Sequence, residues 1–360
     1  MDAPPQVMSI RRPLLTMALS LSACAVMFAA DDFVLGRFSD YLDALRTQAG
    51  IPGMAAAIVG PVGVNWDAAF GLRDVERNVP TRIDTPFQLD GTTQTIVASL
   101  ALRCAGDGWL SLDDPVGKFS PSSPDAGATI RQLLTHTSGS ASNLTFSYRP
   151  ERMAPVAAAV ASCTDSTFRW GVANLVERPA LGLIDTVPGA DVVQLTAPAE
   201  RFTATALQRY RDALGRLATP YAVDARGRSH STYVATTLTP ASGLISTVLD
   251  LEQFDLALKK GVVVRPDMLA YEWTPPNDAN GRPLPHAYGW FVQQYNSERI
   301  VWQFGVSDNA SSSMIIVLPR RGLTLILLAN SQGLARPFPL SAGDVTVSPF
   351  ARLFLSIFAR

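Results

Sequence analysis

The side chains in this chain that could attack an acyl carbon have no base at a useful spacing. Thr92 and Thr93 each offer a hydroxyl, and threonine can serve as a nucleophile once a neighbouring group removes its proton. The residues three positions further along are Thr95 and Ile96, neither of which can accept that proton. The chain has three lysines, none of them in this segment: Lys118, Lys259 and Lys260. A threonine nucleophile is therefore an alternative hypothesis here and not the leading one.

The histidines and cysteines do not show the spacing of a metal site. His136 lies two residues before Ser138, and so short a separation within a turn is poor geometry for a catalytic pair. His230 and His286 stand in polar stretches and are predicted to be solvated. Because three scattered histidines and no clustered cysteines give no ligand set, we predict neither a metal nor another cofactor.

The segment TPFQLDGTTQTIV, residues 85–97, resembles the nucleophile segment of the serine β-lactamase and penicillin-binding-protein superfamily. That segment normally reads Pro-Phe-Arg-Ile-Gly-Ser-x-x-Lys-Thr, where the lysine takes the serine proton during attack. In this chain Gly91 stands at the serine position and Gln94 at the lysine position. Glycine has no nucleophile and an amide has no useful basicity. The resemblance therefore implies the fold, with the nucleophile and the base both lost.

Further blocks in the expected order extend this resemblance over roughly residues 50 to 331. They resemble the family's first strands and its GxLxLDDPV block, and the later blocks follow at plausible spacings: IPGM at 51–54, AAIV at 56–59, AFGL at 69–72, WLSLDDPV at 109–116, IRQLLTHTSG at 130–139, ALGLIDT at 180–186, ASGLIST at 241–247 and YGW at 288–290. Together they imply a β-lactamase/transpeptidase-like fold.

The second and third motifs of the family are also degenerate. Tyr148 in the stretch FSY corresponds to the tyrosine of the second motif, and Pro150 stands where that motif has asparagine. The resemblance gives Tyr148 a vestigial catalytic role. In the stretch WQFG at 302–305, Gln303 occupies the place of the lysine or histidine that attracts a substrate carboxylate, and Gly305 is retained.

One part of the family's site requires no particular side chain. The resemblance places an oxyanion hole at the backbone amides of Gly91 and of Val306, the residue after the third-motif glycine. Such a pair of amides can bind a carbonyl or carboxylate oxygen without any nucleophile present. The implied binding residues are therefore Gly91, Tyr148, Gln303, Gly305 and Val306.

Length and composition are those of a well-buried globular protein. The 360 residues are 47% hydrophobic and 17% charged, and the net charge of −1 gives no basic footprint for nucleic acid. The predicted class is α+β: an antiparallel sheet flanked by N- and C-terminal helices, with a mostly helical inserted domain. The sheet-plus-helix domain is assigned to residues 24–85 and 241–360, and the inserted domain to residues 86–240.

Hydrophobic periodicity supports this organisation. A helical stripe over 31–49 ends at Gly50, and a second helix over 98–105 could be N-capped by Thr92 or Thr93. Alternating segments predict strands at 54–60, 63–72, 288–295, 299–304, 312–318 and 323–329, and an amphipathic helix is expected at 349–358.

The N-terminus is typical of an export signal, which we assign to residues 1–23. Arg11 and Arg12 precede an apolar run that is too short to span a membrane. The run ends in LSAC, which resembles a bacterial lipoprotein box and makes Cys24 the expected lipidation site; an ordinary cleavage site is the alternative. We expect a periplasmic or cell-envelope protein that contacts the membrane only through this lipid.

The sequence leaves open whether Cys104 and Cys163 pair. Both would be exposed to an oxidising compartment after export, but sequence does not give the distance between them. Cys104 lies in an apolar helical run, where a small buried hydrophobic side chain is the usual role.

The leading functional hypothesis is a catalytically degenerate hydrolase homologue that keeps its cleft as a binding site. The predicted ligand is a cell-wall peptide or an acyl-type small molecule. The first alternative is an active esterase, peptidase or β-lactamase-type hydrolase that uses Thr92 or Thr93. The second is a structural interaction protein whose cleft is filled by Phe304 and its apolar neighbours.

Overall fold

The computed structural model describes residues 16–139, 145–176, 181–194, 201–224, 227–231 and 237–360. Two compact units are present, Met1–Tyr41 and Leu42–Arg360. The described part of the first unit belongs to helix α1 (Thr16–Gln48), which ends before Gly50 as the sequence predicts. Residues 1–15 of the expected export signal lie outside the described residues. None of the described helices combines the length and apolar character needed to cross a membrane.

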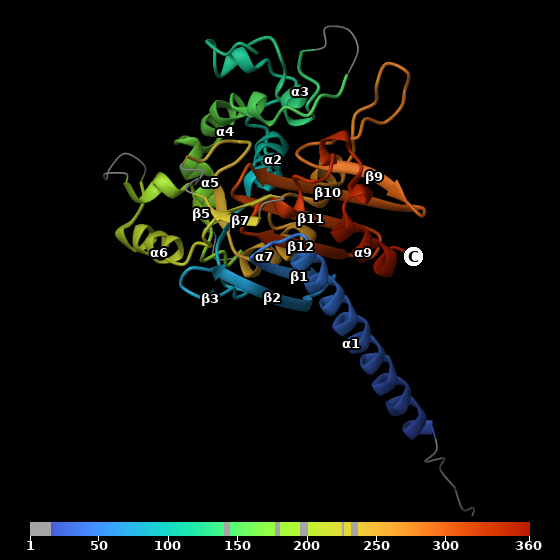
Figure 1. Cartoon of the computed structure of the whole chain (residues 1–360). Helices are drawn as coiled ribbons and strands as arrows, with labels where there is room; N and C mark the ends of the chain where they lie inside the picture. The colour runs from blue at the N-terminus through green and yellow to red at the C-terminus, as the bar shows by residue number, and fades with distance from the viewer. Residues whose placement is uncertain (1–15, 140–144, 177–180, 195–200, 225–226, 232–236) are drawn as a thin grey trace, which may run out of the picture. The chain divides into compact units, whose positions relative to one another are not determined.

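The main sheet has seven strands, all antiparallel, in the order β3-β2-β1-β12-β11-β10-β9 (Figure 1). Strands from the two ends of the chain meet where β1 pairs with β12, Ala57 facing Ile326. This confirms the predicted α+β class. The strands are β1 (Gly53–Val59), β2 (Val64–Asp74), β3 (Val79–Pro80), β9 (Phe291–Tyr295), β10 (Glu298–Ser307), β11 (Ser311–Leu318) and β12 (Leu323–Ala329).

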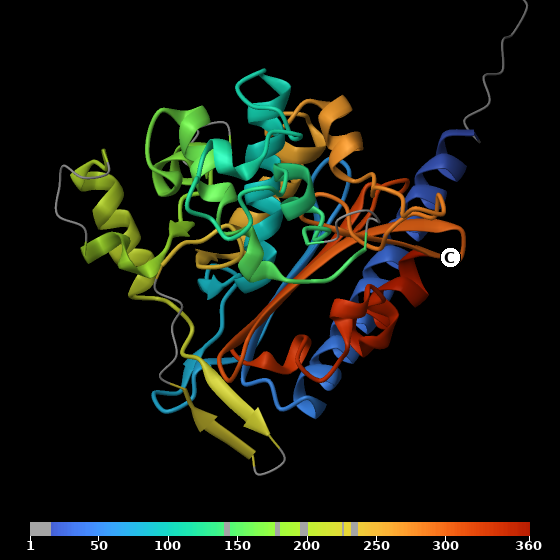
Figure 2. The ribbon, with the colours of Figure 1, turned by 90° about the horizontal axis from the view of Figure 1, so that it is seen from above.

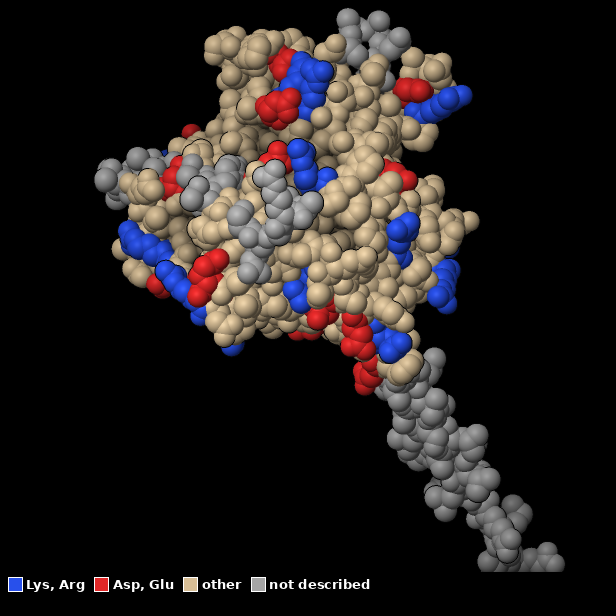
Figure 3. Space-filling view, in the orientation of Figure 1, with Lys and Arg blue, Asp and Glu red and all other residues tan. Residues whose placement is uncertain are grey.

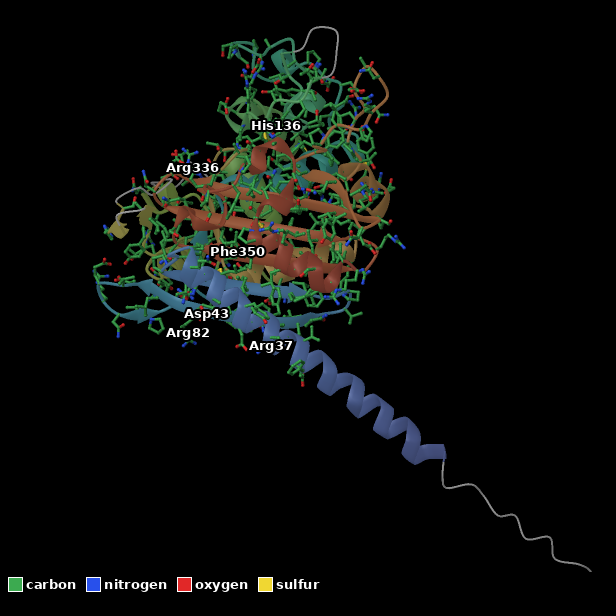
Figure 4. The ribbon with its side chains drawn as sticks, turned by 45° about the vertical axis from the view of Figure 1, so that its right-hand side comes forward. Arg37, Asp43, Arg82, His136, Arg336 and Phe350 are labelled. Atoms are coloured by element: carbon green, nitrogen blue, oxygen red, sulfur yellow. A yellow bond between two sulfur atoms is a disulfide. The ribbon has the colours of Figure 1, made fainter. Side chains whose placement is uncertain are left out.

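The central strands are buried on both faces. Every residue of β1 and β11 is buried, so these strands are nearly continuous in apolar or small residues. Helix α9 (Pro349–Phe358) covers one face of the sheet, and α2 (Thr93–Gly106) and α7 (Val248–Lys259) lie on the other (Figure 2). Phe350 of α9 is 1% exposed and lies over the sheet (Figure 4). Because helices cover both faces of the sheet, its central strands do not alternate between polar and apolar residues.

The segment between the two sets of strands is mainly helical, as expected. It also contains a short sheet, β4-β8-β5, and a hairpin, β6–β7, that the sequence did not indicate. The elements are β4 (Phe87–Gln88), α3 (Ile130–Leu134), α4 (Val156–Thr164), α5 (Phe168–Val176), β5 (Val187–Pro188), α6 (Ala204–Leu214), β6 (Tyr221–Asp224), β7 (Gly227–His230), β8 (Leu244–Ser246) and α8 (Pro266–Glu272). On the face shown in Figure 3, basic and acidic residues are interspersed.

The structure corrects one local expectation and answers one question that the sequence left open. The single turn η1 (Asp90–Thr92) precedes α2, and neither threonine caps that helix with its side chain. The Thr92 hydroxyl is instead 2.7 Å from the Ser313 hydroxyl of β11, because η1 packs directly on the sheet. Cys104 and Cys163 form a disulfide with a Cα–Cα distance of 5.9 Å, so Cys104 is more than a buried hydrophobic side chain.

Candidate functional site

A cavity of about 970 Å³ opens where the start of α2 meets strand β10. Gly91 of η1, Tyr148 from the loop after α3, and Val306 of β10 all line it. Ala241 and Ser242, from the segment before β8, contribute to the opposite wall. Three of the five residues that the sequence assigned to binding therefore line one cavity, while Gln303 and Gly305 are buried and do not line it.

Phe304 lines this cavity without filling it. Its ring lies 5.5 Å from the Tyr148 ring and 5.9 Å from the Phe291 ring, within a cluster of stacked and tilted aromatic side chains. The side chain is 6% exposed, so most of it packs into the protein. The volume that stays open beside it does not support the alternative in which the cleft is plugged by apolar side chains.

The floor of the cavity is unusually close to the sheet, because two glycines face each other there. A Cβ placed on Gly91 would lie 2.5 Å from the Phe304 carbonyl oxygen, and one on Gly305 would lie 2.1 Å from the Leu89 carbonyl oxygen. Real Cβ atoms do not approach backbone oxygens this closely. Gly305, which the sequence assigned to ligand binding, thus allows η1 to pack against β10.

A chain of neutral hydrogen-bonding groups lies directly behind the cavity. Gln94 donates from Nε2 to the Tyr148 hydroxyl over 2.8 Å, and its Oε1 lies 2.9 Å from His136 Nε2. His136 Nδ1 accepts from the Arg149 backbone N–H, so Nε2 carries the proton and donates to Gln94. Gln94 therefore uses both ends of its amide where the family's lysine would stand.

Gln303 continues this layer on the other side of Tyr148. Its Oε1 is 3.5 Å from the Tyr148 hydroxyl, and its Nε2 donates to the Gly289 carbonyl over 2.9 Å. His286 Nε2 lies 3.4 Å from the same Gln303 nitrogen. His286 is 0% exposed, so the prediction that it is solvated was wrong. The aromatic rings of this region, including Phe291 at 4.6 Å, enclose its imidazole.

Burial keeps the titratable groups of this layer neutral. It lowers the pKa of His136 to about 3 and that of His286 well below its ordinary value. It also raises the pKa of the Tyr148 phenol above its ordinary value, and the hydrogen bond from Gln94 offsets this only in part. None of the three can then remove a proton from a hydroxyl at neutral pH, because an effective base needs a pKa near the working pH.

The alternative nucleophiles do not face the cavity. Thr92 and Thr93 are both 0% exposed and are absent from the residues that line it. The Thr93 hydroxyl accepts from the Leu244 backbone N–H over 3.4 Å. The structure also argues against a pair between His136 and Ser138, since both imidazole nitrogens have the other partners described above.

Sequence reasoning missed a buried carboxylate beside the lost nucleophile. Asp90 has a left-handed backbone conformation, with φ of 47°, and its side chain accepts hydrogen bonds from Ser307 and Ser311. It is 1% exposed and burial raises its pKa to about 6. The only sequence signal was its position directly before Gly91, since its two partners lie more than 200 residues away.

Three charged residues form the outer part of the cavity lining: Glu151, Asp308 and Arg336. Arg336 is labelled in Figure 4; its Nε lies 3.2 Å from Asp308 Oδ1, and both side chains are 63% exposed. With Asp90, the lining therefore has three carboxylates and one guanidinium, which is already paired. Among the described residues, no group of His, Cys, Asp or Glu could hold a metal ion.

Comparison with known proteins identifies the family to which this fold belongs. The sequence profile of the Beta-lactamase family matches residues 38–343, and the chain belongs to that family. The octameric penicillin-binding protein homologue from Pyrococcus abyssi has the same fold, with a TM-score of 0.69 at 18% identity over 89% of this chain and 77% of that one. This confirms the superfamily that the motifs indicated.

Curated relatives match only in part and differ in activity. A β-lactamase of Psychrobacter immobilis is 30% identical over 36% of this chain and 35% of its own length. Esterase EstB of Burkholderia gladioli is 43% identical over 24% of each chain. The chain thus spans about a third or less of these relatives, and neither name assigns it a substrate.

Proposed function

We propose that this chain is an exported member of the Beta-lactamase family that no longer forms an acyl-enzyme and uses its cleft to bind a cell-wall peptide or another acyl compound. The observation that carries the proposal is the neutral chain His136–Gln94–Tyr148 beside Gly91. In this arrangement Gly91 stands at the family's nucleophile position and Gln94 at its base position, next to an open cavity of about 970 Å³.

The chemistry of acyl transfer supports this proposal. Losing the nucleophile or its base lowers the rate by about 10⁶-fold in a serine hydrolase, and losing both lowers it little further. The resemblance assigns the family's two carbonyl-binding amides to Gly91 and Val306, and both residues line the cavity. Binding of a carbonyl group therefore has a structural basis that hydrolysis lacks.

Intact-mass analysis after incubation with a fluorophosphonate and with penicillin tests the loss of acylation. We expect no mass increase with either reagent, because Gly91 and Gln94 leave the family's nucleophile and base positions without a hydroxyl and without a lysine. An adduct on any hydroxyl that lines the cavity would overturn the proposal.

Ligand binding is tested separately, by NMR titration with N-acetylated dipeptides. The matched control is Ala241→Trp, which places a large side chain into the cavity from its wall. We expect binding to the natural chain and at least a tenfold weakening in the variant. Equal binding to both chains would place the ligand elsewhere.

Export and the lipid anchor are part of the proposal and rest on the N-terminal sequence alone. If Cys24 is lipidated, the natural chain should fractionate with membranes and Cys24→Ser should not. Recovery of both chains in the same soluble fraction would contradict the anchor and leave the cleft proposal unaffected.

A further inference from the structure

The electrostatic character of this cleft is opposite to that expected for a carboxylate-binding site. Gln94 and Gln303 occupy the two positions where the family has cations, and both contact the Tyr148 hydroxyl from behind the cavity. An opposite charge within about 4–6 Å is what favours a bound anion. Neither amide supplies such a charge.

The lining itself adds negative charge. Glu151 and Asp308 lie at the opening, and Asp90 lies at the floor beside Gly91. The cation among these lining residues, Arg336, already pairs with Asp308 at 3.2 Å. A ligand carboxylate that entered this cavity would lose its hydration and meet carboxylates of the same sign, which is costly without a paired cation.

Asp90 also lies near the N-terminus of α2, where a negative charge is electrostatically favourable. The N-terminus of a helix carries a partial positive charge that favours an anion. Here the side chain of Asp90, in the turn that leads into the helix, already provides that anion and is held by the Ser307 and Ser311 hydroxyls. The helix dipole is therefore compensated within the chain and is not free for a ligand carboxylate.

We propose that the cleft binds acyl ligands whose terminus is neutral, an ester or a carboxamide, and discriminates against the same ligands ending in a free carboxylate. This inference rests on the proposed binding function. A neutral carbonyl can accept from the amides of Gly91 and Val306 without bringing a charge past Glu151 and Asp308. The terminal group of the ligand, more than its side chains, then sets affinity.

A matched ligand series tests this directly. The probes are N-acetyl-D-alanyl-D-alanine, its carboxamide and its methyl ester, which differ only at the terminus, titrated into the full chain by NMR. We expect the carboxamide and the ester to bind at least tenfold more tightly than the free acid, a difference of about 1.4 kcal/mol.

Two variants should change this preference in a defined direction. Gln303→Lys returns a cation to the layer behind Tyr148 and should make the free acid the tighter ligand. Gln208→Lys on the exposed face of α6 is the matched control, because it adds the same charge away from the cavity, and it should leave the ratio unchanged.

Since Gln303 is 0% exposed, its replacement could prevent folding, and a second variant at the opening avoids that risk. Asp308→Asn removes an exposed carboxylate and releases Arg336 from its ion pair. It should strengthen free-acid binding at least threefold and so narrow the affinity ratio between the carboxamide and the free acid.

The outcomes separate this inference from the function on which it rests. If the free acid binds the natural chain as tightly as the carboxamide, the proposed preference is wrong while the binding function stands. If no member of the series shifts a resonance of the cavity residues, both fail together.

Discussion

Glycine at position 91 changes the backbone as well as removing a nucleophile. The Phe304 carbonyl oxygen lies only 2.5 Å from where a Cβ on residue 91 would be. Strand β10 therefore occupies part of the volume that a serine side chain at this position would need. Restoring the lost catalytic residues by substitution alone would meet this steric obstacle before any chemistry could begin.

The variant Gly91→Ser is accordingly expected to destabilise the protein by about 1–3 kcal/mol, the usual penalty of overpacking a well-packed site. Urea denaturation measures the change. The matched control is Gly127→Ser, since a Cβ on Gly127 meets no atom within 4 Å and this residue should tolerate serine. We also expect Gly91→Ser combined with Gln94→Lys to form no penicillin adduct; an adduct would show that β10 yields easily.

The hydrogen bond between Gln94 and Tyr148 gives a second prediction. In Tyr148→Phe the Gln94 amide nitrogen loses its 2.8 Å partner while buried, which should cost about 1–3 kcal/mol of stability. The single variant Gln94→Met also removes the acceptor of His136 Nε2, so the double variant should stay less stable than the natural chain but lose less than the sum of the two single variants. A double-mutant cycle of unfolding free energies measures the coupling, and strictly additive effects would contradict it.

Helix α2 begins beside the cleft and also contains one cysteine of the disulfide. Its Cys104 joins Cys163 of α4 across a sequence separation of 59 residues. The same helix begins at the cleft beside Gly91, so the disulfide holds the helical layer against the element that forms the cavity floor. Helix α2 is therefore the structural connection between the scaffold and the site.

Reduction of this disulfide should lower stability by roughly 4 kcal/mol, from the entropy that a closed loop of this length removes from the unfolded chain. The measurement is the urea midpoint with and without reductant. The double variant Cys104→Ala with Cys163→Ala is the control and should not respond to reductant. An unchanged midpoint in the natural chain would show that the bond contributes nothing to folding.

Across the whole molecule, several buried carboxyl groups make stability depend on pH in an unusual direction. Burial raises the pKa of Asp90 and Asp250 to about 6, that of Glu252 to about 7 and that of Glu272 to about 8. The folded state then binds more protons than the unfolded state between about pH 4 and pH 8. The free energy of unfolding should therefore fall as pH rises through this window.

Glu272 should make the largest single contribution to this slope. It is 0% exposed and accepts from Ser99 and Trp290 through one carboxyl oxygen. Between pH 5 and pH 8 its titration should remove about 3 kcal/mol of stability. Thermal unfolding of Glu272→Gln should show a flatter profile over this range, while Asp212→Asn on exposed α6 should keep the natural slope. A natural profile that rises towards pH 8 would contradict the prediction.

Below about pH 4 the trend should reverse, which limits the predicted optimum to near pH 4. The pKa of Asp113 is lowered by its hydrogen bond from Arg131, and that of Asp125 by its hydrogen bond from Arg152. These carboxylates stabilise the folded state while ionised, and this stabilisation is lost as they protonate. The profile therefore has a maximum between the two groups of titrations.

The sequence by itself determined the long strands of the main sheet, the helical segment and the family, because hydrophobic period and turn residues are local properties. Strands expected at 54–60 and 323–329 are β1 and β12, and the helix expected at 349–358 is α9. It also determined that positions 91, 94 and 303 lack nucleophile, base and cation, since those losses are visible in the residue types alone.

Only the tertiary structure decided what replaced the lost chemistry. The bonds from Asp90 to Ser307 and Ser311 join residues more than 200 positions apart, and no local pattern predicts such a pairing. Burial of His286 likewise follows from the aromatic side chains that fold around it. Residue types fix which groups are available, whereas charge, protonation and access depend on neighbours that only long-range packing brings together.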